Sequence, residues 1–242
     1  MGAPASEAEL EEIVENLLGA GYSMHDMAVV GERVVVQGDI VMGLEASRAL
    51  DGPRFRHYRA ENLVRLSDDA TICIVTWQIA TGFPKLRATL DTALLRWNAL
   101  SLRYRFVATD TPTPQRCDAE ILVELEEFTD EAYATWPDAN GLPGPVIVIG
   151  TRNEDFDADN EALREFTVAT YMHEIGHAMG LRHTDWKERS EARCPIGAHH
   201  IPGTPTEGTA PSVMNSQISE THPTSHWTED DRTAIAELYG RG

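Results

Sequence analysis

Apolar residues recur with a helical period in three stretches of the chain. The first stretch follows a capping box formed by Ser6 and Glu9 and stops at Gly19. Its apolar positions are Leu10, Ile13, Val14, Leu17 and Leu18. The second covers residues 85–100, with Leu86, Leu90, Ala93, Leu94 and Trp97 on one face, and the third covers residues 161–179. This spacing predicts three helices, each with a face that packs against the rest of the protein.

Short apolar runs, bounded by turn residues, predict strands. These runs cover residues 33–42, 70–79, 103–108, 119–125 and 146–149. Between the first two lies an Arg-rich stretch, residues 48–65, whose Gly52 and Pro53 are typical of a linker or exposed loop. We therefore expect a domain boundary near residue 66: an N-terminal helix–strand segment (1–66) precedes a mixed sheet with packed helices (67–242).

Composition narrows the class of protein. The chain has 242 residues, of which 42% are hydrophobic, enough for one sizeable core and an accessory segment. No apolar run approaches the length that crosses a membrane. A net charge of −19 and a pI near 4.7 argue against nucleic acid or an anionic membrane as partner. The sequence does not predict an oligomeric state.

The candidate chemistry is concentrated in residues 173–183, which read His-Glu-Ile-Gly-His-Ala-Met-Gly-Leu-Arg-His. His173 and His177 are four residues apart, so a helix presents both imidazoles to a single ion. Gly180 permits the sharp turn that brings His183 round as third ligand. Three neutral imidazoles leave one position of a tetrahedral zinc open, as in catalytic rather than structural zinc sites.

Glu174 lies beside these predicted ligands without being one of them. Zinc lowers the pKa of a bound water to about 7, and Glu174 can take its proton and pass it to a leaving amine. The motif therefore predicts a zinc endopeptidase that acts on protein or peptide substrates. The alternative is a zinc-bearing but proteolytically silent binding module, closed by its N-terminal segment. Activity of a chain that starts near residue 67 separates the two.

The elongated motif with its third histidine resembles the metzincin clan of metallopeptidases. Ser212-Val213-Met214-Asn215 is similar to the methionine-containing turn of that clan. Residues 201–205 and the stretch 227–240 narrow the resemblance to the bacterial dual-action HEIGH metallopeptidases, whose His-Glu-Ile-Gly-His core is the same. The closing helix also resembles that of the matrixins. The resemblance covers most of the chain.

This resemblance implies an α+β fold with a metzincin-type catalytic domain. That domain has a twisted mixed five-stranded sheet, a backing helix, an active-site helix, an irregular lower lobe and a C-terminal helix. Met214 is expected to pack beneath the metal, and the alternative is a methionine that only fills a gap in a loop. Residues 144–150 are expected to be the edge strand with which an extended substrate pairs. Ser216 stands where astacins and serralysins place a tyrosine, so no tyrosine ligand is expected.

The N-terminal segment carries a candidate latency device. Val36-Gln37-Gly38-Asp39-Ile40 resembles the Phe-x-Gly-Asp motif of astacin prosegments, whose aspartate blocks the zinc, although Val36 replaces the aromatic residue. A carboxylate binds zinc well, at about 2.0–2.2 Å. An ordinary Gly-Asp turn between two strand halves explains the same residues. The segment is therefore either the inhibitory prosegment of a zymogen or a structural hairpin.

Three cysteines, Cys73, Cys117 and Cys194, allow at most one internal disulfide, so their pairing and the redox compartment stay open. Cys73 lies inside an apolar strand pattern and is interpreted as a small buried hydrophobe rather than as a cysteine switch. Residues 1–5 lack the basic region and apolar stretch of a secretory signal. The family resemblance nevertheless implies secretion, with a cytoplasmic location as the alternative.

Two further carboxylate features carry weaker hypotheses. Asp155, Asp157 and Asp159 alternate as Ca²⁺ ligands often do, but Phe166 stands where an EF-hand loop needs glutamate. A solvated acidic loop before the helix is the preferred interpretation. Asp185 follows the third histidine closely and either orients His183 through a hydrogen bond or is a surface aspartate.

Overall fold

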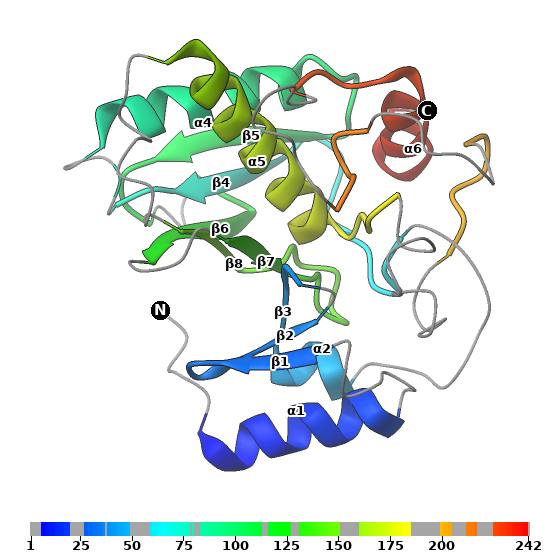
Figure 1. Ribbon diagram of the computed structural model, residues 1–242. Helices are drawn as coiled ribbons and strands as arrows, with labels where there is room; N and C mark the ends of the chain where they lie inside the picture. The colour runs from blue at the N-terminus through cyan, green and yellow to red at the C-terminus, as the bar shows by residue number, and fades with distance from the viewer. Residues whose placement is uncertain are drawn as a thin grey trace.

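The protein folds into one mixed sheet whose strands are covered by helices (Figure 1). The predicted α+β class is confirmed. The computed structural model describes residues 6–19, 27–36, 38–48, 59–77, 79, 83–112, 116–126, 131–150, 160–184, 199–204, 212–216 and 225–241. Within these ranges, none of the helices combines the length and the apolar character needed to cross a membrane.

The sheet contains eight strands among the described residues, in the order β1-β2-β3-β7-β8-β6-β4-β5. The strands are β1 (Met27–Val30), β2 (Arg33–Val36), β3 (Ile40–Met42), β4 (Ala70–Val75), β5 (Tyr104–Thr109), β6 (Ala119–Glu126), β7 (Ala132–Thr135) and β8 (Val146–Gly150). Strands β4, β5, β6 and β8 are parallel to one another, and β7 is antiparallel to β8. The segment 67–242 thus contributes the five expected strands, and the N-terminal segment adds three more through the parallel β3–β7 pair.

Helices α4 (Pro84–Asn98) and α5 (Glu161–Met179) pack together over one face of this sheet, and α6 (Glu229–Tyr239) closes the core. Pro84 begins α4, where its missing N–H has no helical partner to lose. The predicted face of α4 is buried: Leu86, Leu90, Ala93, Leu94 and Trp97. Trp97 packs against Phe106 and Trp227, with ring centroids 5.3 and 4.7 Å away. Aromatic packing therefore joins α4, the sheet and the start of α6.

The N-terminal segment forms its own layer. Helix α1 (Glu7–Gly19) begins with the predicted capping box, in which the Ser6 N–H donates to Glu9 at 2.8 Å, and α2 (Leu44–Arg48) follows β3. Figure 1 shows α1 below β1–β3, on the side away from the other strands. The stretch expected as one strand, residues 33–42, is a hairpin instead, because Gly38 adopts a φ of 94° and reverses the chain. The valine run of β2 has both faces buried and therefore shows no alternation.

Residues 144–150 are not an edge strand, contrary to expectation. β8 pairs with β6 on one side and with β7 on the other. The outer side of β7 pairs with β3, so the N-terminal segment covers the edge of the five-stranded part. The error arose because β7 is only four residues long and lacks a strong apolar run.

The structure decides the cysteine pairing that the sequence left open. Cys73 is 2% exposed, which confirms that it is a small buried residue, and it forms a disulfide with Cys117. This bond ties β4 to the connection that precedes β6. Cys194 lies outside the described residues.

Part of the stretch expected as an exposed loop is packed. Ala60 and Val64 are buried, and the Ala60 N–H donates to the Gly180 carbonyl at 2.7 Å.

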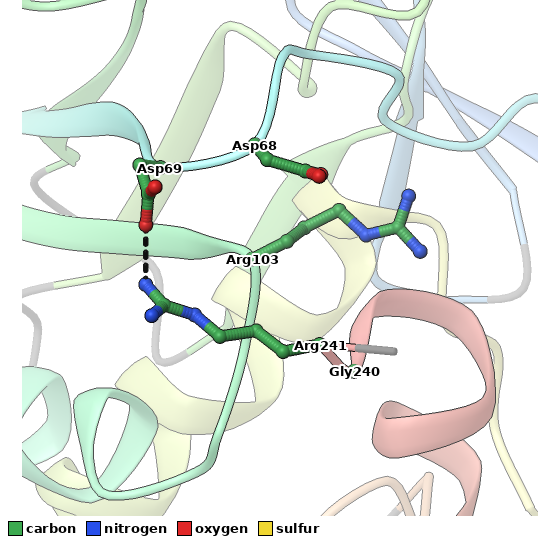
Figure 2. Close-up of a pocket in the computed structure, with 5 residues that line it drawn as sticks. All are labelled: Asp68, Asp69, Arg103, Gly240 and Arg241. Atoms are coloured by element: carbon green, nitrogen blue, oxygen red, sulfur yellow. Dashed lines mark hydrogen bonds and ion pairs between the residues drawn. The ribbon is translucent and has the colours of Figure 1, made fainter.

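Farther along the chain, an ion pair of 2.5 Å between Asp69 and Arg241 ties the C-terminal end to the loop before β4 (Figure 2). The pocket there, of about 310 Å³, is lined by Asp68, Asp69, Arg103, Gly240 and Arg241. None of these residues belongs to the histidine motif, so this pocket is not the metal site.

Candidate active site

Helix α5 presents the histidine motif, and local interactions set both of its ends. The Asn160 side chain accepts hydrogen bonds from the Ala162 and Leu163 N–H groups at 3.0 and 3.4 Å. Gly180 ends the helix with a φ of 99°, a conformation that favours glycine, as the motif predicted. Because the C-terminal half of α5 is buried on all sides, its polar residues must find partners inside the protein.

The three histidines of the motif meet at one point. The Nε2 atoms of His173 and His177 are 2.9 Å apart, and each lies 3.2 Å from Nε2 of His183. All three side chains are essentially buried. The helix supplies two of them, and the turn after Gly180 supplies the third.

Backbone carbonyls orient two of these rings. His173 Nδ1 lies 2.7 Å from the Val213 carbonyl oxygen, and His177 Nδ1 lies 2.8 Å from that of Leu181. A carbonyl only accepts hydrogen bonds, so Nδ1 of both rings must donate, and each neutral ring keeps its lone pair on Nε2. Burial lowers the pKa of His177 to about 4, with the Asp39 carboxylate opposing the shift, so the ring is neutral at pH 7. Converging lone pairs repel one another unless a cation lies between them.

Asp39 approaches the same point from the turn between β2 and β3. Its Oδ2 lies 2.6 Å from Nε2 of His183, 3.2 Å from that of His173 and 3.5 Å from that of His177. Burial would raise the pKa of Asp39, but His183 and His177 hold it well below its usual range. The backbone of Gly38 and Asp39 thus forms an ordinary turn, and the Asp39 carboxylate in that turn also faces the histidines.

The four donor groups fit a divalent metal ion. Their ligand atoms all lie within 4.8 Å of one another. A tetrahedral zinc with bonds of about 2.0–2.2 Å separates its ligand atoms by roughly 3.3 Å. The observed separations of 2.6 to 3.5 Å bracket that value. Asp39 Oδ1 is buried without a hydrogen-bond partner among the described residues, as expected for a carboxylate whose partner is an ion.

Glu174 points into the buried region next to this cluster. Its side chain is 2% exposed, and its Oε2 atom finds no hydrogen-bond partner within the described part of the chain. Burial and the neighbouring Asp39 charge raise the pKa of Glu174 well above its usual range, against the opposing effect of His183. A buried carboxylate with one oxygen left without a hydrogen-bond partner is suited to proton transfer rather than to fold stability.

Met214 is 3% exposed and packs against Gly176 of the motif. A Cβ added to Gly176 would lie 2.5 Å from the Met214 sulfur and 3.0 Å from its terminal methyl carbon. The glycine in the middle of the motif therefore provides the space that the methionine fills. Because His173 and His177 flank this contact on α5, Met214 supports the helical turn that carries them.

A buried carboxylate that the sequence did not single out fixes the turn around Met214. Asp231 accepts hydrogen bonds from the Ser212 hydroxyl at 2.5 Å and from the Val213 and Thr228 N–H groups at 3.2 and 3.0 Å. The Val213 carbonyl in turn accepts from His173. The Thr228-x-x-Asp231 capping box was visible in the sequence, but its contact with the turn depends on the fold.

Asp185, Asp155, Asp157 and Asp159 lie outside the described residues, so their predicted roles remain predictions.

The family model of the dual-action HEIGH metallopeptidases matches residues 34–239. This chain belongs to that family. The match includes β3 and all of β2 except Arg33, and hence the turn that carries Asp39. Among solved structures, the crystal structure of myroilysin is 14% identical to this HEIGH metallopeptidase, with a TM-score of 0.44; the match covers 75% of this chain and 87% of that chain. A search of curated proteins found no match.

Proposed function

We propose that this HEIGH metallopeptidase is a zinc endopeptidase kept latent by its own N-terminal segment. The observation that carries the proposal is the convergence of three buried imidazole nitrogens, two of them oriented by carbonyls, on one point that Asp39 also faces. Neutral imidazoles with a carboxylate are a donor set typical of zinc.

In this proposal His173, His177 and His183 hold the zinc. When bound, zinc polarises the substrate carbonyl and lowers the pKa of a water molecule to about 7. Glu174 accepts the proton of the attacking water and returns it to the leaving amine nitrogen. Its burial and its unpaired Oε2 support this role, because the carboxylate is held ready without a competing partner.

Asp39 supplies the latency. Its Oδ2 faces all three histidines, so it would occupy the ligand position that a catalytic water would need on a bound zinc. Strand β3 continues from this turn and pairs with β7 at Ile40–Ala134 and Val41–Thr135. A hairpin that both supplies a carboxylate to the metal and covers the neighbouring strand blocks the water and the substrate together.

We further propose that an extended substrate pairs with β7 once β3 has left. β7 lies at one of the two edges of the five strands in 67–242. Its N–H groups on the outer side are free to bind another strand only after β3 leaves; the Ala134 N–H, for example, now donates to the Asp39 carbonyl at 3.0 Å. Backbone pairing of this kind accepts varied side chains.

The packing supports a boundary earlier than residue 66. Leu63 and Val64 pack with the main core, whereas α1, β2 and β3 form a second cluster in which Ala60 and Trp136 also take part. We therefore place the proposed limit of the inhibitory segment between Arg48 and Arg59. The disulfide between Cys73 and Cys117 supports secretion, because such bonds persist in oxidising compartments.

The test is to substitute Asp39→Ala in the full chain and measure zinc content and casein hydrolysis. Hydrolysis should rise by on the order of tenfold or more, because a tethered carboxylate competes at a high effective concentration. Glu32→Ala is the matched control, since Glu32 is an exposed carboxylate of the same segment. A second form carries an inserted protease site between Arg48 and Arg59 and is cut after folding.

One zinc per chain, with activity only after substitution or cutting, supports the latent enzyme. One zinc with no activity in any form favours the silent binding module. Activity that is already high in the unmodified chain contradicts the blocking role of Asp39.

A further inference from the structure

Away from the histidines, the N-terminal segment makes a second polar contact with the sheet. Arg33, the first residue of β2, extends its guanidinium to Glu124 and Glu126 of β6 and to Tyr133 of β7. Nη2 lies 2.6 Å from Glu124, and Nη1 lies 2.7 Å from the Tyr133 hydroxyl and 3.4 Å from Glu126. The guanidinium carbon lies 5.7 Å from the centre of the Tyr133 ring.

The arrangement matches the shape of a guanidinium group. Two different nitrogens of the planar fork have separate partners, and an aromatic ring lies alongside. The Tyr133 hydroxyl accepts from Arg33 and donates to Glu126, so two of the three receiving groups are themselves connected. Burial and the bond to Glu126 raise the pKa of Tyr133 to about 12, so the hydroxyl keeps the proton that it donates.

An apolar contact lies beside this polar one. Val35 and Val41, from β2 and β3, form a cluster with Tyr133 and Val148 on the other side of the contact. Arg33 and Val35 are two residues apart on one strand and so share a face. The same face of the hairpin therefore makes two contacts: the Arg33 cation lies on Glu124 and Glu126, and the apolar side chains lie on β7 and β8. The residues in these two contacts do not belong to the metal cluster.

We propose that Glu124, Glu126 and Tyr133 form a guanidinium-binding site that docks the N-terminal segment through Arg33. Besides the β3–β7 pairing and the apolar contact, the segment is then held by two separate polar contacts, Asp39 at the histidines and Arg33 at the sheet. Release requires loss of both polar contacts, and an arginine-bearing ligand that competes for the site loosens the segment without touching the metal. The inference rests on the proposed latency for its effect on activity, but not for the docking itself.

The experiment measures hydrogen–deuterium exchange of β3 and β7 in the full chain, together with casein hydrolysis. The Ala134 N–H reports docking directly, since it donates to the Asp39 carbonyl. Arg33→Ala should speed this exchange by roughly fivefold, the size expected for charge-assisted bonds that solvent partly screens. Arg33→Lys, which keeps the charge but loses the fork, should give an intermediate rate. Glu124→Gln removes a negative charge from the sheet side of the same contact and tests it independently of Arg33.

Arg48→Ala is the matched control, because Arg48 pairs with Glu12 and Glu45 inside the N-terminal segment alone. Methylguanidinium, with uncharged methylurea as its control, should speed exchange in the unmodified chain but not in Arg33→Ala. Faster exchange without hydrolysis in any form supports the docking site and counts against the proposed protease. If Arg33→Ala and Glu124→Gln both exchange like Arg48→Ala, or if methylguanidinium has no effect, the site does not dock the segment.

Discussion

At the residue scale, Glu174 combines deep burial with an oxygen that has no hydrogen-bond partner. Asp231 is 5% exposed and accepts three hydrogen bonds, and Asp39, whose side chain is 16% exposed, faces three imidazoles. Glu174 is 2% exposed, and its Oε2, like Oδ1 of Asp39, has no partner among the described residues. Burying an unpaired carboxylate is costly, so a fold that keeps one next to a metal cluster is expected to use it in the reaction.

Substitution of Glu174→Gln in the Asp39→Ala background tests this role. Glutamine keeps the size of the side chain but cannot take a proton, so hydrolysis should fall by about 10²- to 10⁴-fold while zinc content stays unchanged. Hydrolysis and metal content are measured on the same preparation. The control is Glu161→Gln, at the exposed start of the same helix. Substantial remaining hydrolysis would exclude Glu174 as the general base.

At the element scale, α6 supports the proposed metal ligands through the turn around Met214. The first turn of α6 places Asp231 against Ser212 and Val213, and Val213 accepts the His173 hydrogen bond. The end of the same helix packs near the end of α5, where the Tyr239 hydroxyl donates to the Met179 carbonyl. A C-terminal helix without any proposed catalytic residue thus helps to set the orientation of a ligand.

Asp231→Ala should therefore affect both stability and metal binding. Loss of a helix cap and of two buried bonds to the turn should cost roughly 2–4 kcal/mol, which lowers Tm by about 5–15 °C in a chain of this size. Zinc affinity should fall by about 10- to 100-fold, because His173 loses the support of its carbonyl partner. Tm and competition with a chromophoric chelator measure the two effects. Asp230→Ala, in the same helical turn, should change both far less; equal effects would contradict the role of Asp231.

At the scale of the whole molecule, covalent and noncovalent contacts join distant parts of the chain. The disulfide links Cys73 and Cys117 across a sequence separation of 44 residues. Arg33 and Asp39 connect the N-terminal segment to the sheet and to the histidines. Each of these contacts closes a long loop, which restricts the unfolded chain or holds a segment in place.

Reduction of the disulfide should lower the free energy of unfolding by about 2–4 kcal/mol, because the unfolded chain regains the freedom of a long loop. Thermal unfolding with and without reductant measures the change, and a Cys73→Ala, Cys117→Ala double variant should reproduce it. The control is Cys194→Ser, which leaves the Cys73–Cys117 pair intact. A reductant effect that persists in the double variant would show that another bond is responsible.

The sequence by itself determined the features that depend on local spacing. The bounds of α5, its asparagine cap and glycine end, the apolar face of α4 and the capping box of α1 follow from residues within a few positions of one another. The His-Glu-x-x-His spacing likewise indicated metal chemistry, because one helical turn brings the two histidines together. These features depend only on the period of the helix.

Only the tertiary structure decided which distant residues meet. It placed Asp39 against histidines that lie more than 130 residues later in the chain, joined Cys73 to Cys117, and inserted β7 between β8 and β3. Gly38 and Asp39 form a turn in either case, and the position at which the hairpin docks decides whether the Asp39 carboxylate also faces the histidines. Strand pairing and side-chain packing set that position, and residues far apart in sequence leave no local period from which it can be read.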